Sequence, residues 1–311
     1  MALLFGALPL HSQFVTIPDD AFLSALIEEG VDKNGDCLIS PEEAELITYL
    51  DIAGNWDEGK PGEIKDLKGI ETFVNLDTLR CNYNQLSSLD LSENTSLTFL
   101  RCNENQLSSL DVSACKALIR LDCDRNLLST LNVSNNASLE RLSCRMNRLS
   151  SLDVSGCIVL KRLDCDNNQL SSLDVSNNDV LANLQCWENH LSSLDVYACK
   201  ALTRLDCDYN QLSTLSVSNN TSLEKLKCRM NQISNLEVSG CISLTELEFE
   251  SNLLGTLDIS NNTALKKINM RDNPTLHEVC VWTIPFQDEI MKIFTGGSPN
   301  VYFTSDCSID Q

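Results

Sequence analysis

The stretch from Leu160 to Val180, LKRLDCDNNQLSSLDVSNNDV, returns with small changes every 21 residues along most of this 311-residue chain. Leu occupies positions 1, 4, 11 and 14 of the unit, Cys position 6, Asn position 9 and Val position 16. Repetition at such a period is the signature of a solenoid, in which each coil stacks on the next. Ten units begin at Leu76, Leu97, Leu118, Leu139, Leu160, Leu181, Leu202, Leu223, Leu244 and Leu265. We therefore expect one repeat array over residues 76–275.

The spacing within the unit indicates how each coil is built. Apolar residues at positions 4 and 6 alternate along one strand, and those at positions 14 and 16 alternate along a second extended segment. Position 9 is Asn in every unit, from Asn84 to Asn273. A buried turn leaves backbone groups that must be paired, and side-chain amides can pair them between neighbouring coils. These Asn residues are therefore predicted to be structural.

Twelve of the 15 cysteines follow the same rhythm. Eight recur every 21 residues from Cys81 to Cys228, and four recur every 42 residues from Cys115 to Cys241. Free Cys behaves as a small buried hydrophobic residue, so these twelve are predicted to lie in the core. Cys37, Cys280 and Cys307 fall outside the pattern.

The repeated residues resemble the leucine-rich repeat family, whose pattern is LxxLxLxxNxL with Cys tolerated at the third apolar site. The second half of the unit, LSSLDVSxN, resembles the short 21-residue nested class of exported bacterial proteins, often from Bacteroidetes. The resemblance implies a leucine-rich repeat solenoid, an α/β to mainly β right-handed superhelix. Its parallel sheet would lie on the concave face, beside a small helical N-terminal cap.

The N-terminus carries an apolar run, Ala2–Leu10, followed by His-Ser-Gln. This pattern suits the hydrophobic region and cleavage site of a secretory signal, so residues 1–13 are interpreted as a signal-peptide remnant. The alternative is a hydrophobic strand that caps the solenoid. No other segment approaches the roughly 20 apolar residues of a membrane span. We expect an exported protein that is secreted or at the cell surface.

The segment 14–75 is predicted to be an N-terminal cap with a metal-binding loop. Helical patterns over residues 18–29 and 42–50 flank a loop that resembles an EF-hand. That resemblance implies calcium bound by Asp32, Asn34, Asp36, the carbonyl of Leu38 and Glu43. Cys37 stands where the family has Gly, at a cost of about 1 kcal/mol in a sharp turn. The alternative is an acidic capping turn without metal.

The segment 276–311 loses the repeat and is predicted to be a C-terminal cap. Residues 277–282 have the pattern of a final strand, residues 285–294 that of an amphipathic helix, and residues 298–303 that of another extended piece. Because a solenoid must cover its terminal apolar face, we expect Cys280 and Cys307 to staple this cap through a disulfide. The alternative is two free buried thiols.

Charge and motif content exclude several functions. There are 44 acidic and 23 basic residues, a net charge of −21, which is the wrong sign for a nucleic-acid groove or an anionic membrane surface. Neither HExxH nor GxSxG is present, and there are only 3 His. Paired carboxylates recur as Asp-Cys-Asp but alternate with basic residues along the array, which indicates charge balancing. We predict that the protein is not an enzyme.

The concave face is the predicted binding surface, because positions 3, 5, 7 and 8 of each unit should point away from the core. Arg and large amphipathic side chains are favoured at interface hot spots. The alternative is a solvated, salt-bridged surface. We expect an exported scaffold that binds a protein ligand; a glycan-binding or adhesion module is the alternative, with Trp187 and the Asp pairs contacting sugar. The candidate residues are Arg120, Asp122, Asp124, Arg141, Arg145, Arg162, Asp164, Asp166, Trp187, Arg204, Asp206, Asp208, Tyr209 and Arg229.

Overall fold

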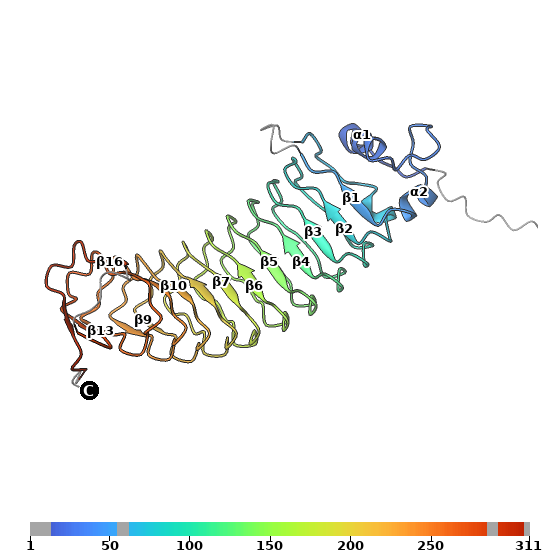
Figure 1. Ribbon diagram of the computed structural model, residues 1–311. Coiled ribbons are helices and arrows are strands. Elements are labelled where there is room, and N and C mark those ends of the chain that lie inside the picture. Colours follow the sequence, from blue (N-terminus) through green and yellow to red (C-terminus); the bar gives the residue numbers. More distant parts are fainter. Residues whose placement is uncertain (1–13, 55–61, 285–291, 308–311) are drawn as a thin grey trace, which may run out of the picture.

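The computed structural model describes residues 14–54, 62–284 and 292–307. They form a solenoid of stacked coils with two short helices at its N-terminal end (Figure 1). The predicted signal-peptide remnant, residues 1–13, lies outside the described residues. Among the residues described, no helix combines the length and the apolar character needed to cross a membrane.

The main sheet is parallel, and its strands follow one another in chain order along the array. Equivalent repeat positions face each other in register, so that Leu142 lies opposite Leu163. The position-4 Leu residues therefore form one continuous buried column beneath the sheet. The strands are β1 (Tyr49–Asp51), β2 (Thr78–Arg80), β3 (Phe99–Arg101), β4 (Arg120–Asp122), β5 (Arg141–Ser143), β6 (Arg162–Asp164), β7 (Asn183–Gln185), β8 (Arg204–Asp206), β10 (Lys225–Lys227), β12 (Glu246–Glu248), β14 (Lys267–Asn269) and β16 (Lys292–Phe294).

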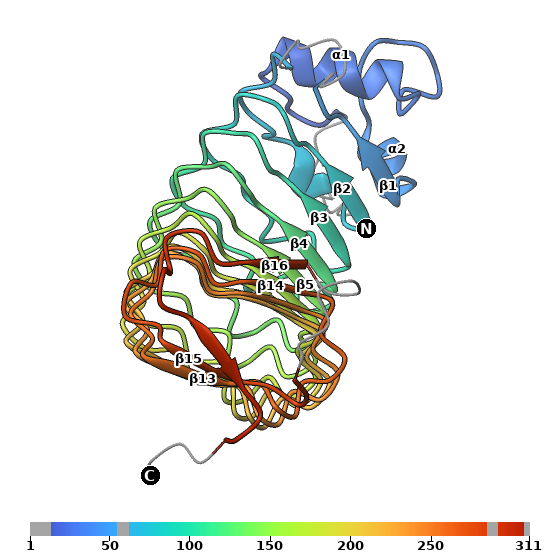
Figure 2. The ribbon, with the colours of Figure 1, turned by 60° about the vertical axis from the view of Figure 1, so that its left-hand side comes forward.

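The second extended segment of each coil lies across the core from the main sheet, as the view along the solenoid shows (Figure 2). It pairs regularly in the C-terminal coils, as β9 (Thr214–Ser216) with β11 (Asn235–Glu237), and as β13 (Thr256–Asp258), β15 (Glu278–Cys280) and β17 (Tyr302–Thr304). Nearer the N-terminus, isolated bridges link Asp111, Asn132 and Asp153. The predicted second segment is thus present, and it forms named strands in the later coils.

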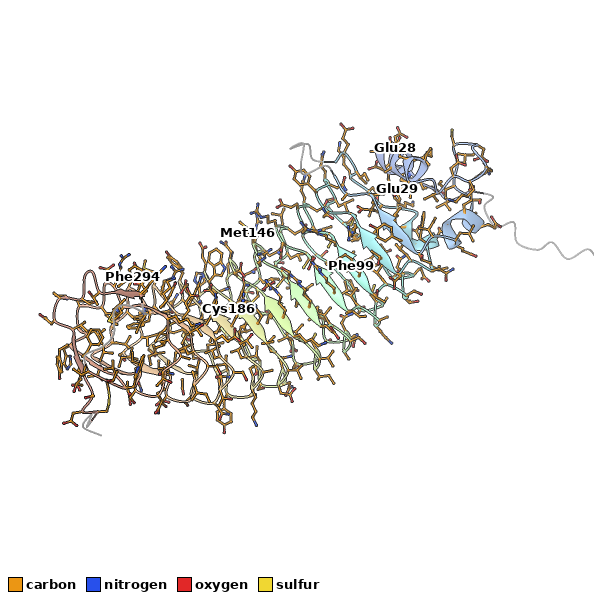
Figure 3. The ribbon with its side chains drawn as sticks, viewed as in Figure 1. Glu28, Glu29, Phe99, Met146, Cys186 and Phe294 are labelled. Carbon is orange, nitrogen blue, oxygen red and sulfur yellow. A yellow bond between two sulfur atoms is a disulfide. The ribbon has the colours of Figure 1, made fainter. Side chains whose placement is uncertain are left out.

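The twelve rhythmic cysteines lie in the core, as predicted: each is 0% exposed and carries a free thiol. Cys186, one of the twelve, is labelled in Figure 3. Burial raises the pKa of these thiols, for example to about 11 at Cys115. They remain protonated at neutral pH, so they serve packing and not nucleophilic chemistry.

The position-9 Asn residues link consecutive coils. The Nδ2 of Asn147 donates to the carbonyls of Cys123, Cys144 and Arg145 at 3.1, 3.1 and 3.2 Å. Its Oδ1 accepts from the backbone N–H of Leu128 at 3.0 Å. The preceding residue, Met146, has a left-handed backbone with φ 53°, and the same holds at this place in every coil although none carries Gly there. The amide ladder therefore stabilises a turn that is costly for non-glycine residues.

The N-terminal cap differs from its prediction in one element. Helix α1 (Asp20–Glu28) is capped by Asp19, whose Oδ1 accepts from the N–H of Phe22 at 3.0 Å. Helix α2 (Pro41–Glu45) ends before residue 50, so the predicted helix over 42–50 is wrong in its second half. Residues Tyr49–Asp51 form β1 instead, because they pair with β2 and cover the open edge of the main sheet. A 3-10 turn, η1 (Ile70–Thr72), leads into the array.

The C-terminal cap also differs from its prediction. The helix predicted over residues 285–294 is wrong at its end, since Lys292–Phe294 form β16, which pairs with β14 and closes the other sheet edge. Residues 285–291 lie outside the described part of the chain. Residues 278–280 form a strand within the predicted segment 277–282, and the strand over residues 302–304 overlaps the end of the predicted segment 298–303. Cys280 and Cys307 form a disulfide with their Cα atoms 5.5 Å apart.

Candidate functional site

The concave face is the surface of the main sheet that carries positions 3, 5, 7 and 8 of each coil. Positions 3 and 5 flank the buried position-4 Leu on each strand, and positions 7 and 8 follow where the strand ends. All fourteen candidate residues occupy these positions. The side chains of this face are drawn in Figure 3, where Phe99 and Met146 are labelled.

The carboxylates lie deeper than the sequence suggested. Asp122, Asp124, Asp164, Asp166 and Asp208 are between 1% and 9% exposed, although they were expected to point into solvent. The basic residues cover them and are half-buried or exposed. On this face a buried layer of carboxylates therefore lies beneath a more exposed layer of guanidinium groups.

Most of these carboxylates are neutralised within the fold. Arg120 and Arg162 bind the Asp two residues ahead on their own strands, at 2.5 Å to Asp122 and 2.6 Å to Asp164. Across coils, the Nη2 of Arg145 binds Asp124 at 2.7 Å, and the Nη2 of Arg229 binds Asp208 at 2.6 Å. This geometry agrees with charge balancing and leaves these acids engaged as structural partners.

The exposed apolar groups of the concave face stand where each strand ends. Tyr209, Met146 and Met230 occupy position 8 and are 51%, 42% and 45% exposed. Trp187, at position 7, is half-buried. These side chains offer amphipathic contact area on the surface that also holds the arginines.

An aromatic–arginine stack near the N-terminal end escaped the sequence reasoning. The guanidinium of Arg80 lies 5.8 Å from the ring centroid of Tyr49 and 5.6 Å from that of Phe99. The guanidinium of Arg120 lies 5.1 Å from the ring centroid of Phe99. These are cation–π distances. The sequence did contain a signal for it, because Phe99 occupies position 3, where the next three units carry Arg.

A polar hollow of about 380 Å³ opens on the same face beyond Trp187. Its lining includes Asn183, Gln185, Arg204, Asp206, Lys225 and Lys227. Within the described residues, Arg204 and Lys227 make no ion pair, unlike Lys225, which binds Glu246 at 3.1 Å. Burial raises the pKa of Asp206 to about 6. The hollow thus offers a ligand two cations, those of Arg204 and Lys227, that are not paired with a described acid; they are called the uncommitted cations below.

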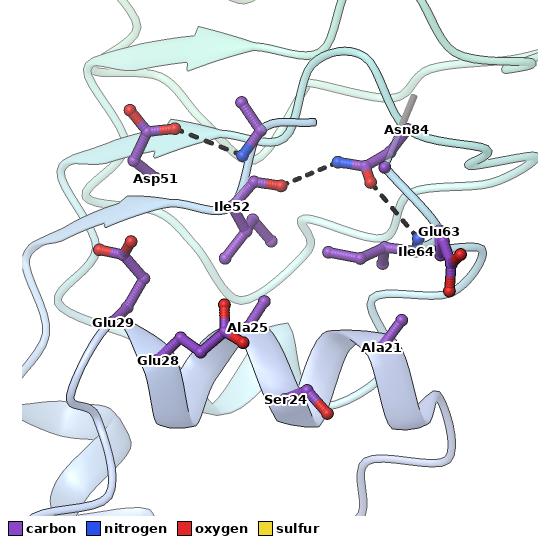
Figure 4. A pocket seen from close by; sticks show the side chains of 12 residues that line it. Ala21, Ser24, Ala25, Glu28, Glu29, Asp51, Ile52, Glu63, Ile64 and Asn84 are labelled. Carbon is purple, nitrogen blue, oxygen red and sulfur yellow. Dashed lines mark hydrogen bonds between the residues drawn. The ribbon is translucent and has the colours of Figure 1, made fainter. Parts of the chain in front are cut away.

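A second hollow, of about 360 Å³, lies between α1 and the first coils (Figure 4). Glu28, Glu29 and Asp51 line it. Beside it, the Nδ2 of Asn84 donates to the carbonyl of Ile52 at 2.8 Å, which ties the array to its cap. Residues 55–61, which adjoin the lining residue Gly62, lie outside the described ranges. This hollow therefore lies at the junction between the N-terminal cap and the repeat array.

The EF-hand-like loop has a donor set suited to calcium. The side chains of Asp32, Asn34, Asp36 and Glu43 and the carbonyl of Leu38 can each offer an oxygen atom, the kind of ligand that calcium prefers. Asp32 accepts from the N–H of Gly35 at 2.7 Å and from that of Cys37 at 2.9 Å. Backbone hydrogen bonds to Glu43, led by that from Ser40, hold the pKa of its carboxyl below the usual range.

The backbone of this loop also fits the turn that the resemblance implies. Cys37 has φ 63°, the left-handed conformation that favours Gly at that place. The loop therefore forms the sharp turn despite its Cys.

The fold and its 21-residue motif define a leucine-rich repeat solenoid. A scan of protein-family models and a search of curated proteins gave no match. Among solved structures, the functional domain of InlJ from Listeria monocytogenes, described as including a cysteine ladder, is 29% identical with a TM-score of 0.68, covering 90% of this chain and 69% of that one.

Two further solved structures share the fold. Internalin InlF from Listeria monocytogenes is 20% identical with a TM-score of 0.63, covering 93% of this chain and 95% of its own. YopM from Yersinia enterocolitica is 23% identical with a TM-score of 0.62, covering 83% and 60%. At this level of identity the likeness concerns the fold.

Proposed function

We propose that this protein is an exported, non-enzymatic scaffold that binds a protein partner through its concave face, as a secreted or cell-surface protein. The observation that carries the proposal is the gathering of Trp187, Tyr209 and the uncommitted cations of Arg204 and Lys227 on one face. The opposite side of the same coils carries mostly small polar residues such as Ser171 and Ser172. Aromatic and Arg side chains are what protein interfaces favour.

A glycan ligand is the second candidate, because Trp187 could stack on a sugar ring. Sugar hydroxyls, however, are usually bound by carboxylates that are free to accept. Here Asp122, Asp124, Asp164 and Asp208 are buried and already bound to arginines, which leaves Asp166 as the one buried Asp among the described residues of this face without an Arg partner. This favours protein over glycan, and a glycan array with the full-length chain separates the two.

The proposal can be tested by photo-crosslinking. A photoreactive phenylalanine analogue replaces Tyr209 on the concave face or, as a matched control, Tyr197, which is 67% exposed in the segment opposite the sheet. We expect one partner protein to crosslink at residue 209 and not at residue 197. Equal capture at both places, or capture at residue 197 alone, would contradict a concave binding site.

We also propose that the loop from Asp32 to Glu43 binds calcium and so stabilises the N-terminal cap. A ligand that binds only the folded state raises the unfolding temperature. The change to test is the isosteric double substitution Asp32→Asn with Glu43→Gln. The control is Asp195→Asn, which removes an acidic charge outside the loop. Calcium should raise the unfolding temperature of the wild-type and control proteins and leave the double variant unchanged. Identical melting curves in chelator and in millimolar calcium would leave an acidic capping turn.

A further inference from the structure

The position-7 column on the concave face has a break at Trp187. In two places an Asp at this position is followed, one coil later, by an Arg that binds it: Asp124 with Arg145, and Asp208 with Arg229. Asp166 occupies the same place between these two pairs, and the next coil supplies Trp187 where the pattern would place an Arg. The chain therefore contains its own matched comparison.

Asp166 lacks what its two counterparts have. The carboxylate of Asp208 accepts from the N–H of Arg229 at 2.6 Å and from its Nε at 2.7 Å. Asp124 is bound in the same way by Arg145 and also by the hydroxyl of Ser143 at 2.6 Å. Asp166 is 2% exposed, and its Oδ1 is buried with no hydrogen-bond partner among the described residues.

The neighbouring groups do not supply the missing charge. Arg145 is bound to Asp124, and Asp164, two residues before Asp166, is bound to Arg162. On the other side, the N–H of Asn167 donates to the carbonyl of Trp187 at 2.9 Å, which places the two coils in contact there. Glu188, next to Trp187, accepts from the Nδ2 of Asn167 at 2.7 Å. Asp166 thus has the carboxyls of Asp164 and Asp124 and an occupied Arg145 as its charged neighbours. The residue at the equivalent position of the next coil is Trp187.

This arrangement is costly without a ligand. A buried carboxylate with no partner forfeits its hydration, and burial raises the pKa of Asp166 to about 7. An aromatic face beside a carboxylate is, in contrast, favourable for a cation, because the ring quadrupole and the negative charge attract it together.

We propose that Asp166 and Trp187 form a binding site for a cationic side chain, Lys or Arg, of the protein partner. The cation would take the place that the guanidinium groups of Arg145 and Arg229 occupy in the matched coils. This inference rests on the proposed function and deepens it, since it names the chemistry of the partner residue at the centre of the face.

The test uses the whole protein and a short acetylated Gly-Arg-Gly amide peptide as the probe. Binding is followed through the backbone amide NMR signals of Asn167 and Trp187 at mildly alkaline pH, where Asp166 is ionised. We expect saturable shifts in the wild-type protein and in the control Asp195→Asn, which removes one charge from the opposite side. Affinity should fall at least about tenfold in Asp166→Asn and in Trp187→Arg, a loss of roughly 1.4 kcal/mol.

Several outcomes overturn the inference. These are equal affinity in all four proteins, the same shifts with a Gly-Glu-Gly peptide, or shifts produced by calcium chloride alone and not by the Arg peptide. A second readout is independent of binding: Trp187→Arg rebuilds the pair seen at Asp208 and should lower the pKa of Asp166 measured by carboxyl-carbon NMR. An unchanged pKa would show that a cation at position 187 does not stabilise the ionised carboxylate of Asp166.

This inference and the proposed function fail separately. If a partner crosslinks at residue 209 but binds Asp166→Asn and Trp187→Arg as tightly as wild type, the inference is wrong and the proposed function stands. If no partner crosslinks at residue 209, the proposed function fails, and the peptide titration still decides whether Asp166 and Trp187 hold a cation.

Discussion

Replacement of Asn147 by alanine should lower the free energy of unfolding by about 3 kcal/mol. The amide of Asn147 serves three carbonyls and one N–H, and these groups lie in two adjacent coils. Truncation leaves several buried polar groups without partners, each at a cost of roughly 1–3 kcal/mol before relaxation. Urea unfolding followed by circular dichroism measures the loss. Because coils contact only their neighbours, the loss of stability should be centred on the coils that start at Leu118 and Leu139.

The matched control is Asn135→Ala, the same substitution twelve residues earlier. Asn135 is exposed on the surface of its coil, so its removal should change the free energy of unfolding by less than about 0.5 kcal/mol. If Asn147→Ala were as mild as Asn135→Ala, the amide ladder would not be what stabilises the position-8 turn.

The substitution Arg229→Leu should lower the free energy of unfolding by about 3 kcal/mol, the lower end of the usual cost of removing one partner of a buried ion pair. Asp208 is 2% exposed, and Arg229 binds both Asp208 and, at 3.4 Å, Glu248. The control is Arg204→Leu, since Arg204 is exposed and forms no ion pair with a described acid; its effect should be within about 0.5 kcal/mol. Chemical unfolding of both variants gives the comparison, and equal losses would contradict the structural role of the pair.

The Arg229→Leu effect should also depend on pH, with a definite sign. Burial raises the pKa of Asp208, and hydrogen bonds from Arg229 oppose that rise. Without Arg229 the folded-state pKa climbs further above its unfolded value of about 3.9. The penalty is therefore full above the raised folded pKa and shrinks as pH falls towards the unfolded value. A loss of stability that grew on acidification would contradict this account.

The repeat made most of the fold predictable. Leu, Cys and Asn at fixed places in the unit decide what is buried in every coil, and the structure confirms the core positions of Cys81 to Cys228 and the bridging role of Asn147. Such features depend on one coil and its neighbour, so a single unit such as residues 160–180 contains the information. Helix α1 was likewise predictable from a local feature, the helical pattern over residues 18–29.

Elements at the ends of the array were harder to predict, because their partners are distant in sequence. Tyr49–Asp51 and Lys292–Phe294 carry short apolar patterns that fit helix or strand equally, and the open edges of the main sheet decide for strand. The depth of the carboxylates was missed for a similar reason. Asp208 is buried because Arg229 in the next coil covers it. The missing Arg beside Asp166 could have been found by reading position 7 down the units.

The most direct test of the central claim is the affinity of the crosslinked partner for Trp187→Ala, measured together with the unfolding midpoint. Trp187 is half-buried on the concave face, and its side chain forms no hydrogen bond or ion pair with the residues that the structure describes. The account predicts at least about tenfold weaker binding, or roughly 1.4 kcal/mol, with a midpoint close to that of the wild type. Unchanged affinity together with a large loss of stability would show that Trp187 packs as core and that the concave face is not the binding surface.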